Sequence, residues 1–224
     1  MNSQLPPGTP SPDRIESIQR LVVSSMYPVR PLPSNRVLVS SVLGLFVLLA
    51  FICTLPFGWL GLHALSSGQK LLYFGLILLL AYVLGRAVVE DMIPGSLRRV
   101  NRPVLIGGAF PLAGAAVALL FPSFATVRFV HFGIPCLRLG LVCAAIGGLF
   151  LFLLLRRGFL TAPFQTCCLA GVLAGLVGFG GLAIHCPLLQ ASHILVWHLG
   201  AVFLAGMSGA LVGSLLTRSN PPRL

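Results

Sequence analysis

Acidic side chains are almost absent from this sequence. Its 224 residues include four of them, Asp13, Glu16, Glu90 and Asp91, and none lies inside a long apolar stretch. Ion-driven transporters and pumps generally carry ionisable groups within their membrane spans, so the absence disfavours that class. A serine hydrolase needs a base held by an acid, and paired carboxylates are missing too, so we expect no enzyme. We interpret Glu90 and Asp91, which neighbour several arginines, as a solvated charge cluster.

Charged residues of both signs make up only 8% of the sequence, whereas soluble domains contain roughly a quarter. The sequence instead contains six apolar stretches of about 18–22 residues, which are long enough to cross a hydrocarbon core of roughly 30 Å. The sequence therefore predicts an all-α membrane protein with six transmembrane helices. The predicted spans are Val37–Trp59, Leu71–Val89, Val104–Leu120, Ile134–Leu155, Phe164–Ile184 and Ile194–Leu216. Some 36 residues precede the first span, which favours an uncleaved helix over a signal peptide.

The net charge of +11 comes from basic residues that lie mostly on one side of the predicted bundle. Twelve of the fifteen lie on the side of the termini, and only Lys70, Arg128 and Arg138 lie on the other. Since basic loops stay in the cytoplasm, we predict that both termini are cytoplasmic. The predicted parts are a cytoplasmic arm (1–36), a membrane domain (37–216) and a cytoplasmic tail (217–224). The basic charge therefore needs no nucleic-acid partner, and we expect no direct nucleic-acid binding.

The arm contains one predicted amphipathic helix. Residues 1–12 are rich in Pro, Ser and Gly and are expected to be disordered, Ser11-Pro12-Asp13 is typical of a helix start, and Pro28 ends the helix. One apolar stripe runs along it, formed by Ile15, Ile18, Leu21 and Val22. The stripe predicts contact with the membrane interface, with a groove in a cytosolic partner, or with the protein's own inner loops. The acidic residues on the helix favour a protein partner over an anionic lipid surface.

Spans five and six are rich in glycine. Gly171 and Gly175 are one helical turn apart in span five, and Gly206, Gly209 and Gly213 have similar spacing in span six. Small residues one turn apart let helix backbones approach closely. We therefore predict that spans five and six pack as a tight pair.

The predicted outer side gathers every histidine and two of the six cysteines. These residues are His63, His131, His185, His193, His198, Cys136 and Cys186. Thiolates form more readily beside cations, and Arg138 lies near Cys136 while His185 precedes Cys186. The two thiols can bridge if their Cα atoms come within about 7 Å, because the outer side is oxidising. The other four cysteines lie within spans, where we expect small buried apolar residues.

Binding of a soft metal such as copper or zinc is the alternative chemistry for this side. The candidate ligands are His185, Cys186, His193 and His198. Their spacing matches no closed zinc motif, so we expect at most a transient metal and no resident cofactor. With either chemistry, Arg138, His185 and His193 are predicted to support the two thiols.

Five short segments occur in a particular order along the chain. They are Pro28-Val29-Arg30-Pro31-Leu32, Cys136-Leu137-Arg138, Leu154-Leu155-Arg156-Arg157-Gly158, His185-Cys186-Pro187 and Trp197-His198-x-Gly200. With these segments, the chain from about Asp13 to Arg218 resembles the NrsF-type family of bacterial membrane anti-sigma factors. The His-Cys-Pro turn with the following Trp is the most specific part of the resemblance.

The resemblance implies a six-span inner-membrane protein that sequesters an extracytoplasmic-function sigma factor and releases it under oxidative or metal stress. It implies sensing by an outer pair of cysteines, which by position are Cys136 and Cys186. It also makes the cytoplasmic arm the sigma-binding element. The residues of the arm that this assigns to the sigma factor are Ile15, Ile18, Leu21, Val22 and Arg30.

Two other functions stay open from the residues alone. A small metal or solute permease would use the outer histidines and cysteines as its first binding site. The spans offer few polar groups that would continue such a path inward, which disfavours transport. A structural or assembly subunit is the other alternative.

Overall fold

The computed structural model of the protein describes residues 12–25, 33–93, 101–124, 128–156, 158 and 162–219. The chain divides into two compact units, Met1–Pro33 and Ser34–Leu224. In the first unit, α1 (Pro12–Ser25) is a helix, as the Ser-Pro-Asp start predicts. Pro28 and Arg30, the predicted helix stop and the predicted sigma-binding arginine, lie outside the described residues.

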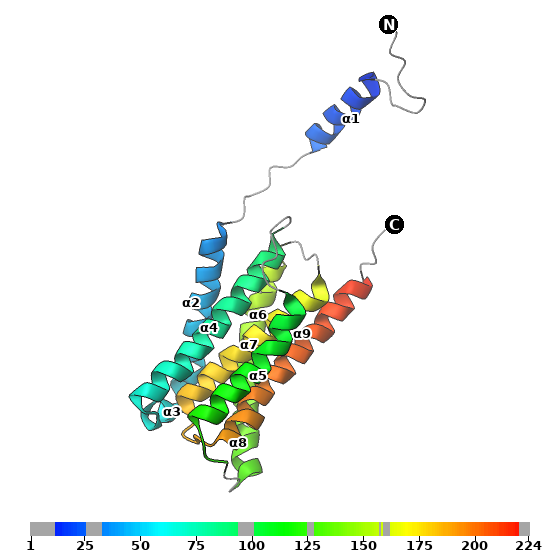
Figure 1. The fold of residues 1–224 in the computed structure, drawn as a ribbon. Coiled ribbons are helices and arrows are strands. Elements are labelled where there is room, and N and C mark those ends of the chain that lie inside the picture. The colour runs from blue at the N-terminus through cyan, green and yellow to red at the C-terminus, as the bar shows by residue number, and fades with distance from the viewer. Residues whose placement is uncertain are drawn as a thin grey trace. The chain divides into compact units, whose positions relative to one another are not determined.

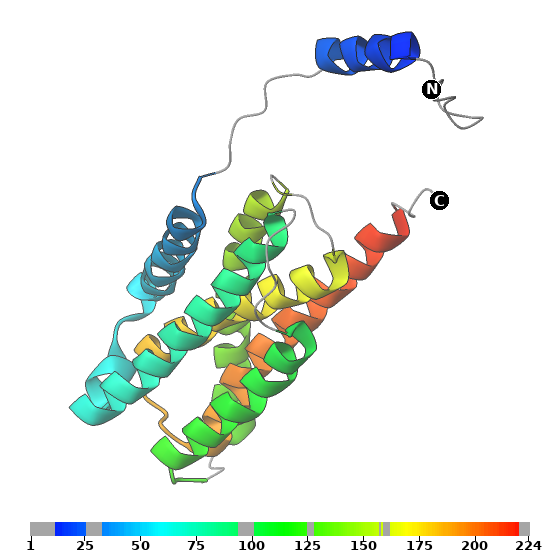
Figure 2. The same ribbon diagram turned by 45° about the horizontal axis from the view of Figure 1, so that its top comes forward.

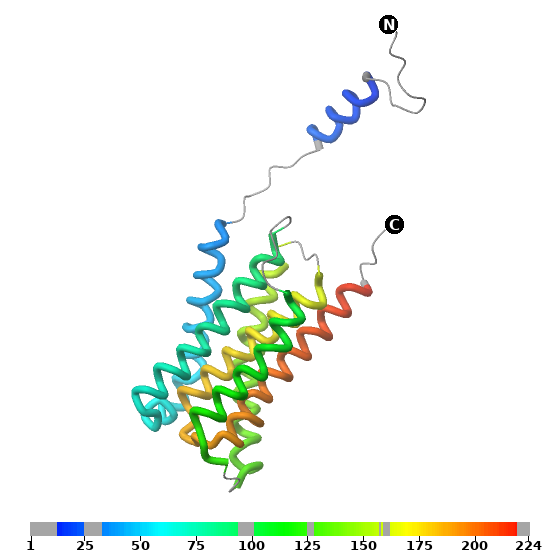
Figure 3. Tube along the Cα trace, in the orientation of Figure 1, coloured from blue at the N-terminus to red at the C-terminus, as the bar shows by residue number. Residues whose placement is uncertain are grey.

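Six helices in the described part of the second unit are long and apolar enough to cross a membrane. They are α2 (Asn35–Thr54), α4 (Ser67–Met92), α5 (Arg102–Leu120), α6 (Phe129–Leu155), α7 (Pro163–His185) and α9 (Leu199–Ser219). Each overlaps one predicted span, so the all-α architecture with six spanning helices is confirmed. The trace in Figure 3 shows successive long helices running in alternating directions.

Local sequence explains where the first two spanning helices differ from their predicted bounds. The first span was predicted to reach Trp59, but α2 ends at Thr54 and gives way to a short 3-10 helix, η1 (Leu55–Phe57). Pro56 has no N–H to continue the α-helical ladder, and Gly58 turns the chain at a φ of 79°. The second helix begins before the predicted residue 71 because Ser66 and Gln69 form a capping box.

Besides η1, three short elements lie at the same end of the bundle, where α3 and α8 are labelled in Figure 1. α3 (Leu60–Ala64) precedes α4, while α8 (Ala191–His193) and a π-helical segment, η2 (Ile194–His198), lead into α9. All five histidines belong to these elements, to the first turn of α6 or to the last residue of α7. We call this end of the bundle the His/Cys end.

α7 is the central helix of the bundle (Figure 2). It contacts α2, α4, α6 and α9, and 89% of its apolar window is buried. The corresponding window of α5 is only 17% buried, so α5 lies at the periphery with most of its side chains outward. An apolar helix that is buried on all sides belongs to the interior of a large protein or of a helical membrane bundle.

Glycines allow the neighbours of α7 to reach its backbone. A Cβ atom added at Gly171 would clash with the Ala205 carbonyl oxygen of α9, and one at Gly175 would lie 2.5 Å from the Val202 Cα. On the other side of α7, a Cβ atom at Gly178 would clash with the Gly140 carbonyl oxygen of α6. The predicted tight pairing of spans five and six is therefore confirmed, and α6 joins it through a close contact of its own.

We predict that Gly171→Ala destabilises the bundle, because the added methyl group meets backbone atoms of α9 that cannot move independently. The expected loss is about 1–3 kcal/mol in the free energy of unfolding, typical of overpacking. Thermal unfolding of the purified protein in detergent measures the effect. Gly44→Ala is the matched control, since a Cβ atom there meets nothing within 4 Å. Equal unfolding temperatures for the two variants would contradict the packing described.

Candidate functional site

Two cysteines and two histidines meet at the His/Cys end. Cys136 comes from α6, Cys186 directly follows α7, His193 ends α8 and His198 ends η2. The four ligand atoms all lie within 4.8 Å of one another. The Cys136 Sγ atom is 3.7 Å from the Cys186 Sγ atom, which is 3.6 Å from the His193 Nε2 atom. We call these four residues the Cys/His cluster.

The π-helical segment η2 brings the two histidines to the same side. His193 and His198 are five residues apart, and a regular α-helix would turn them about 140° away from each other. A π-helix bonds residue i to i+5, so residues with this spacing lie one above the other. The two imidazole rings accordingly lie 5.2 Å apart, at an angle of 81°. Single π-helical turns inside α-helices are frequent at functional sites.

A glycine in α6 brings Cys136 within reach of η2. A Cβ atom at Gly133 would overlap the indole ring of Trp197, so only glycine allows this ring to lie against α6. Trp197 also contacts the Phe129 ring, with centroids 5.3 Å apart. Since Cys136 is three residues after Gly133, the same contact holds the thiol close to the two histidines.

The cluster is almost shielded from solvent. Cys186, His193 and His198 are between 1% and 4% exposed, and Cys136 is half-buried. Hydrogen bonding from the Cys136 thiol, and then from His193, lowers the pKa of the Cys186 thiol, whereas burial acts in the opposite direction. Neither ring nitrogen of His198 has a hydrogen-bond partner among the described residues. Buried polar atoms rarely lack a partner unless water or an ion supplies one.

The distances fit tetrahedral binding of a soft metal. With Zn–S bonds of about 2.3 Å and Zn–N bonds of about 2.05 Å, a tetrahedron has S–S edges of about 3.8 Å and S–N edges of about 3.6 Å. The observed separations of 3.7 Å between the sulfurs and 3.6 Å between Cys186 and His193 agree with these edges. The separations within the cluster reach up to 4.8 Å, so the ligand atoms that are farthest apart have to approach each other on binding.

The structure brings together four of the residues that the sequence predicts for this site and leaves two apart. His185 lies away from the cluster, because its Nδ1 atom is 3.3 Å from the Gly58 carbonyl oxygen and its ring packs against Phe57. Arg138 is exposed on α6. The four residues that converge therefore differ from the predicted metal ligands at one position: they include Cys136 and not His185. The sequence shows His185 and Cys186 as neighbours but not that their side chains diverge.

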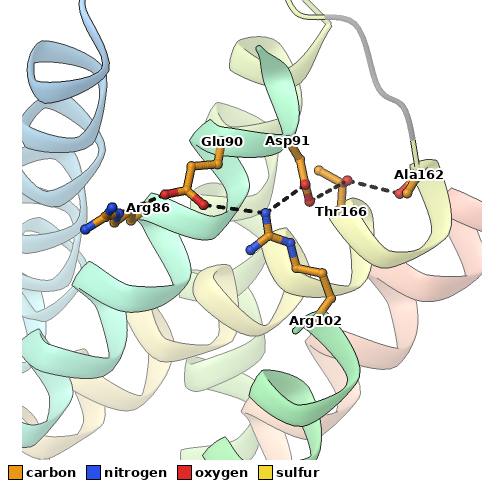
Figure 4. Close-up of polar contacts among 6 residues, drawn as sticks. All are labelled: Arg86, Glu90, Asp91, Arg102, Ala162 and Thr166. Carbon is orange, nitrogen blue, oxygen red and sulfur yellow. Dashed lines mark hydrogen bonds and ion pairs between the residues drawn. The ribbon is translucent and has the colours of Figure 1, made fainter. Parts of the chain in front are cut away.

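A second buried polar site lies at the other end of the bundle (Figure 4). The Arg102 Nη2 atom donates to the Asp91 Oδ1 atom at 2.8 Å, and the Thr166 hydroxyl lies 3.1 Å from Asp91 Oδ2. Arg86 Nε donates to Glu90 at 2.8 Å. Glu90, Asp91 and Arg102 are each at most 5% exposed. The interpretation of Glu90 and Asp91 as a solvated charge cluster is therefore wrong.

Tertiary packing buries these charges, and sequence spacing gave no sign of it. Arg102 begins α5 and is 11 residues from Asp91, whereas Thr166 in the first turn of α7 is 75 residues away. Thr166 lies near the first residue of α7, and Cys186 follows the last residue of the same helix. A helix of this length measures about 34 Å, so α7 links the ion network to the Cys/His cluster.

We predict that Asp91→Asn destabilises the protein strongly, because it leaves the buried Arg102 guanidinium without its closest negative charge. Breaking a buried pair from one side typically costs about 3–5 kcal/mol. Urea unfolding in detergent measures the loss. Glu16→Gln, in the exposed Glu16–Arg20 pair, is the control and should leave stability unchanged. Adding Arg102→Met to Asp91→Asn should restore stability, and a failure to do so would show that the charge pairing is not the cause.

We also predict that the full chain in detergent binds about one Zn²⁺ or Cu⁺ ion through two thiolates and two imidazoles. Competition with a chelator of known affinity measures the binding. Replacing Cys136 and Cys186 by Ser should weaken it at least tenfold, because serine hydroxyls are poor ligands for soft metals. His185→Ala is the matched control and should bind like the unchanged protein. Equal weakening by both changes would contradict the ligand set.

Comparison with protein families matches residues 22–218 to the NrsF family, described as negative regulator of sigma F. The match covers the whole membrane domain, including every residue of both polar sites, but begins after most of the apolar stripe of α1. Neither the curated proteins nor the solved structures that were compared match the chain. Its six-helix architecture, its His-Cys-Pro turn and this match lead to one conclusion. The chain belongs to the NrsF family of negative regulators of sigma F, whose partner is a sigma factor.

Proposed function

We propose that the protein is an inner-membrane anti-sigma factor that holds an extracytoplasmic-function sigma factor and releases it when Cys136 and Cys186 sense redox or metal stress. Both termini are cytoplasmic in this proposal, and the His/Cys end faces the oxidising side. The single observation that carries it is the Cys/His cluster, in which two thiols and two imidazoles converge. Thiols and imidazoles are groups that respond to oxidants and soft metals.

Oxidation of the cluster would join α6 to the end of α7. The two thiols lose two protons and two electrons to an oxidant such as a peroxide, which is reduced to water or an alcohol. The disulfide then has an S–S distance of about 2.05 Å, so the sulfurs approach by about 1.7 Å from their present 3.7 Å. A bound soft metal would instead keep this separation and draw the four ligand atoms into a tetrahedron. Each event changes the packing of the same helix end.

One helix, α7, connects the Cys/His cluster to the opposite end of the bundle. Cys186 follows the last residue of α7, and Thr166 in its first turn bonds to Asp91. Because α7 is enclosed by four helices, a displacement of its end disturbs the packing along its length. A switch of this kind requires two packings that differ by only a few kcal/mol. The buried Asp91–Arg102 ion pair supports such a switch, because a small displacement of either side chain breaks the pair.

The arm is the proposed binding element for the sigma factor. The described residues of α1 carry the apolar stripe on an exposed helix, and Leu21 is 72% exposed within its own unit. An exposed amphipathic helix is suited to a hydrophobic groove in a partner. Asp13 and Glu16 offset the charges of Arg14 and Arg20, so α1 has no net positive charge to attract an anionic lipid surface, which favours a protein groove.

The structure gives less support to the permease alternative. Between Thr166 and His185, α7 carries only apolar side chains, glycines and two cysteines. The buried residues that pack around it are mostly apolar, and the hydroxyl-bearing Thr54 and Tyr73 contact it only near Phe179 and Gly181. The side chains of α7 itself would offer a transported cation no oxygen or nitrogen ligand between the two polar sites.

The proposal predicts that a tagged full-length protein, solubilised from its own membranes, retains a sigma factor and loses it after peroxide or copper treatment. Mass spectrometry of the co-purified proteins measures the retained amount. Replacing Cys136 and Cys186 by Ser should preserve binding and reduce the stress-induced loss at least tenfold. Cys168→Ser, in a half-buried thiol outside the cluster, should release the partner like the unchanged protein.

Two variants of the arm test the binding element in the same experiment. Ile18→Glu with Leu21→Glu should abolish retention without stress, because two charges enter the apolar stripe. Gln19→Glu adds one charge between these positions on the polar face and should retain the sigma factor. The proposal is wrong if no sigma factor is retained by the unchanged protein, or if the double cysteine variant releases it normally.

A further inference from the structure

A polar cleft opens between α2 and α4 at the end of the bundle opposite the His/Cys end. It has a volume of about 600 Å³. Its polar lining residues are Asn35, Arg36, Ser40, Tyr82 and Arg86. These residues belong to the first two turns of α2 and to the last three turns of α4. The cleft therefore lies at the boundary of the spanning segments, at the depth where lipid headgroups meet the hydrocarbon core.

The cleft is suited to an anion. Arg36 is exposed, and in Figure 4 the Arg86 guanidinium lies on the side of α4 that faces α2, where its Nε atom donates to Glu90. Two arginines thus face the cleft, whereas no carboxylate lines it. No side chain caps the first turn of α2, so its N–H groups add partial positive charge. Arginines and free helix N–H groups together form a phosphate-binding arrangement.

An apolar groove continues along the same pair of helices. Its volume is about 220 Å³, and its lining is entirely apolar. The residues from these two helices are Phe46, Val47, Ala50, Phe51, Phe74, Ile77 and Leu78. Residues of the cleft and of the groove lie on the same face of each helix. On α2 this face carries Arg36, Val39, Phe46 and Ala50. On α4 it carries Arg86, Tyr82 and Leu78.

We call the cleft and the groove together the α2–α4 seam, and we propose that this seam binds an anionic glycerophospholipid, with the phosphate between Arg36 and Arg86 and the end of one acyl chain in the apolar groove. The eleven residues from Arg36 to Val47 cover about 16 Å, close to half of the roughly 30 Å hydrocarbon core. One leaflet's acyl chain therefore reaches the near edge of the groove, at Val47, whereas the lining residues Leu62 and Ile184 lie farther toward the His/Cys end. Free phosphate shares the headgroup chemistry but leaves the groove without an occupant. The proposal is independent of the sigma-factor assignment.

The test is equilibrium binding of lipids to the full chain in detergent, followed by native mass spectrometry. Phosphatidylglycerol should bind more tightly than phosphatidylcholine, and millimolar inorganic phosphate should not displace it. Arg36→Gln should weaken phosphatidylglycerol binding about tenfold, which is the effect of one charge-assisted hydrogen bond. Val47→Trp should weaken it comparably, because the larger side chain fills the groove.

Matched controls lie on α9. Arg218→Gln removes an exposed arginine, and Val212→Trp enlarges an exposed apolar side chain; neither residue lines the seam. Both variants should bind phosphatidylglycerol like the unchanged protein. Equal losses in Arg36→Gln and Arg218→Gln would overturn the proposal, because binding would then reflect overall charge. Displacement by inorganic phosphate, or normal binding in Val47→Trp, would overturn it in favour of a simple anion site.

Discussion

The close packing of helices around α7 determines where polar chemistry can occur in this protein. Gly171, Gly175 and Gly178 let α9 and α6 approach its backbone, so that α7 is enclosed over almost its whole length. An enclosed helix in an apolar bundle cannot carry polar side chains in its middle, since each would need a partner there. Polar groups are consequently confined to its two ends, near Thr166 and after His185.

The two ends of α7 differ in the chemistry that can change them. At the His/Cys end, Cys186 lies beside a second thiol and an imidazole, and its bonding partners change on oxidation or metal binding. At the other end, Asp91 and Arg102 form a buried ion pair, which offers oxidants and soft metals no thiol or imidazole. One end can therefore change state, while the other responds only to displacement.

Sequence patterns predicted the features that depend on composition and regular spacing. Six apolar stretches gave the six spanning helices, the glycine spacing gave the tight α7–α9 pair, and position alone placed Cys136 and Cys186 at one end. Features that depend on irregular backbone or distant contacts were missed. The π-helical turn that aligns His193 with His198 has no simple sequence signal, and the bond from Thr166 to Asp91 spans 75 residues. The sequence also could not show that His185 turns away from Cys186.

The central claim is that the state of the Cys136–Cys186 pair and the binding of the sigma factor are coupled. Coupling between two binding equilibria is reciprocal, so the sigma factor must change the redox behaviour of the thiols. The most direct measurement is a glutathione titration of the thiol pair in the full-length protein in a bilayer, with and without bound sigma factor. We expect the bound sigma factor to make the pair harder to oxidise. The equilibrium constant for oxidation should fall by the same factor by which oxidation weakens sigma-factor binding. Identical midpoints with and without sigma factor would contradict it.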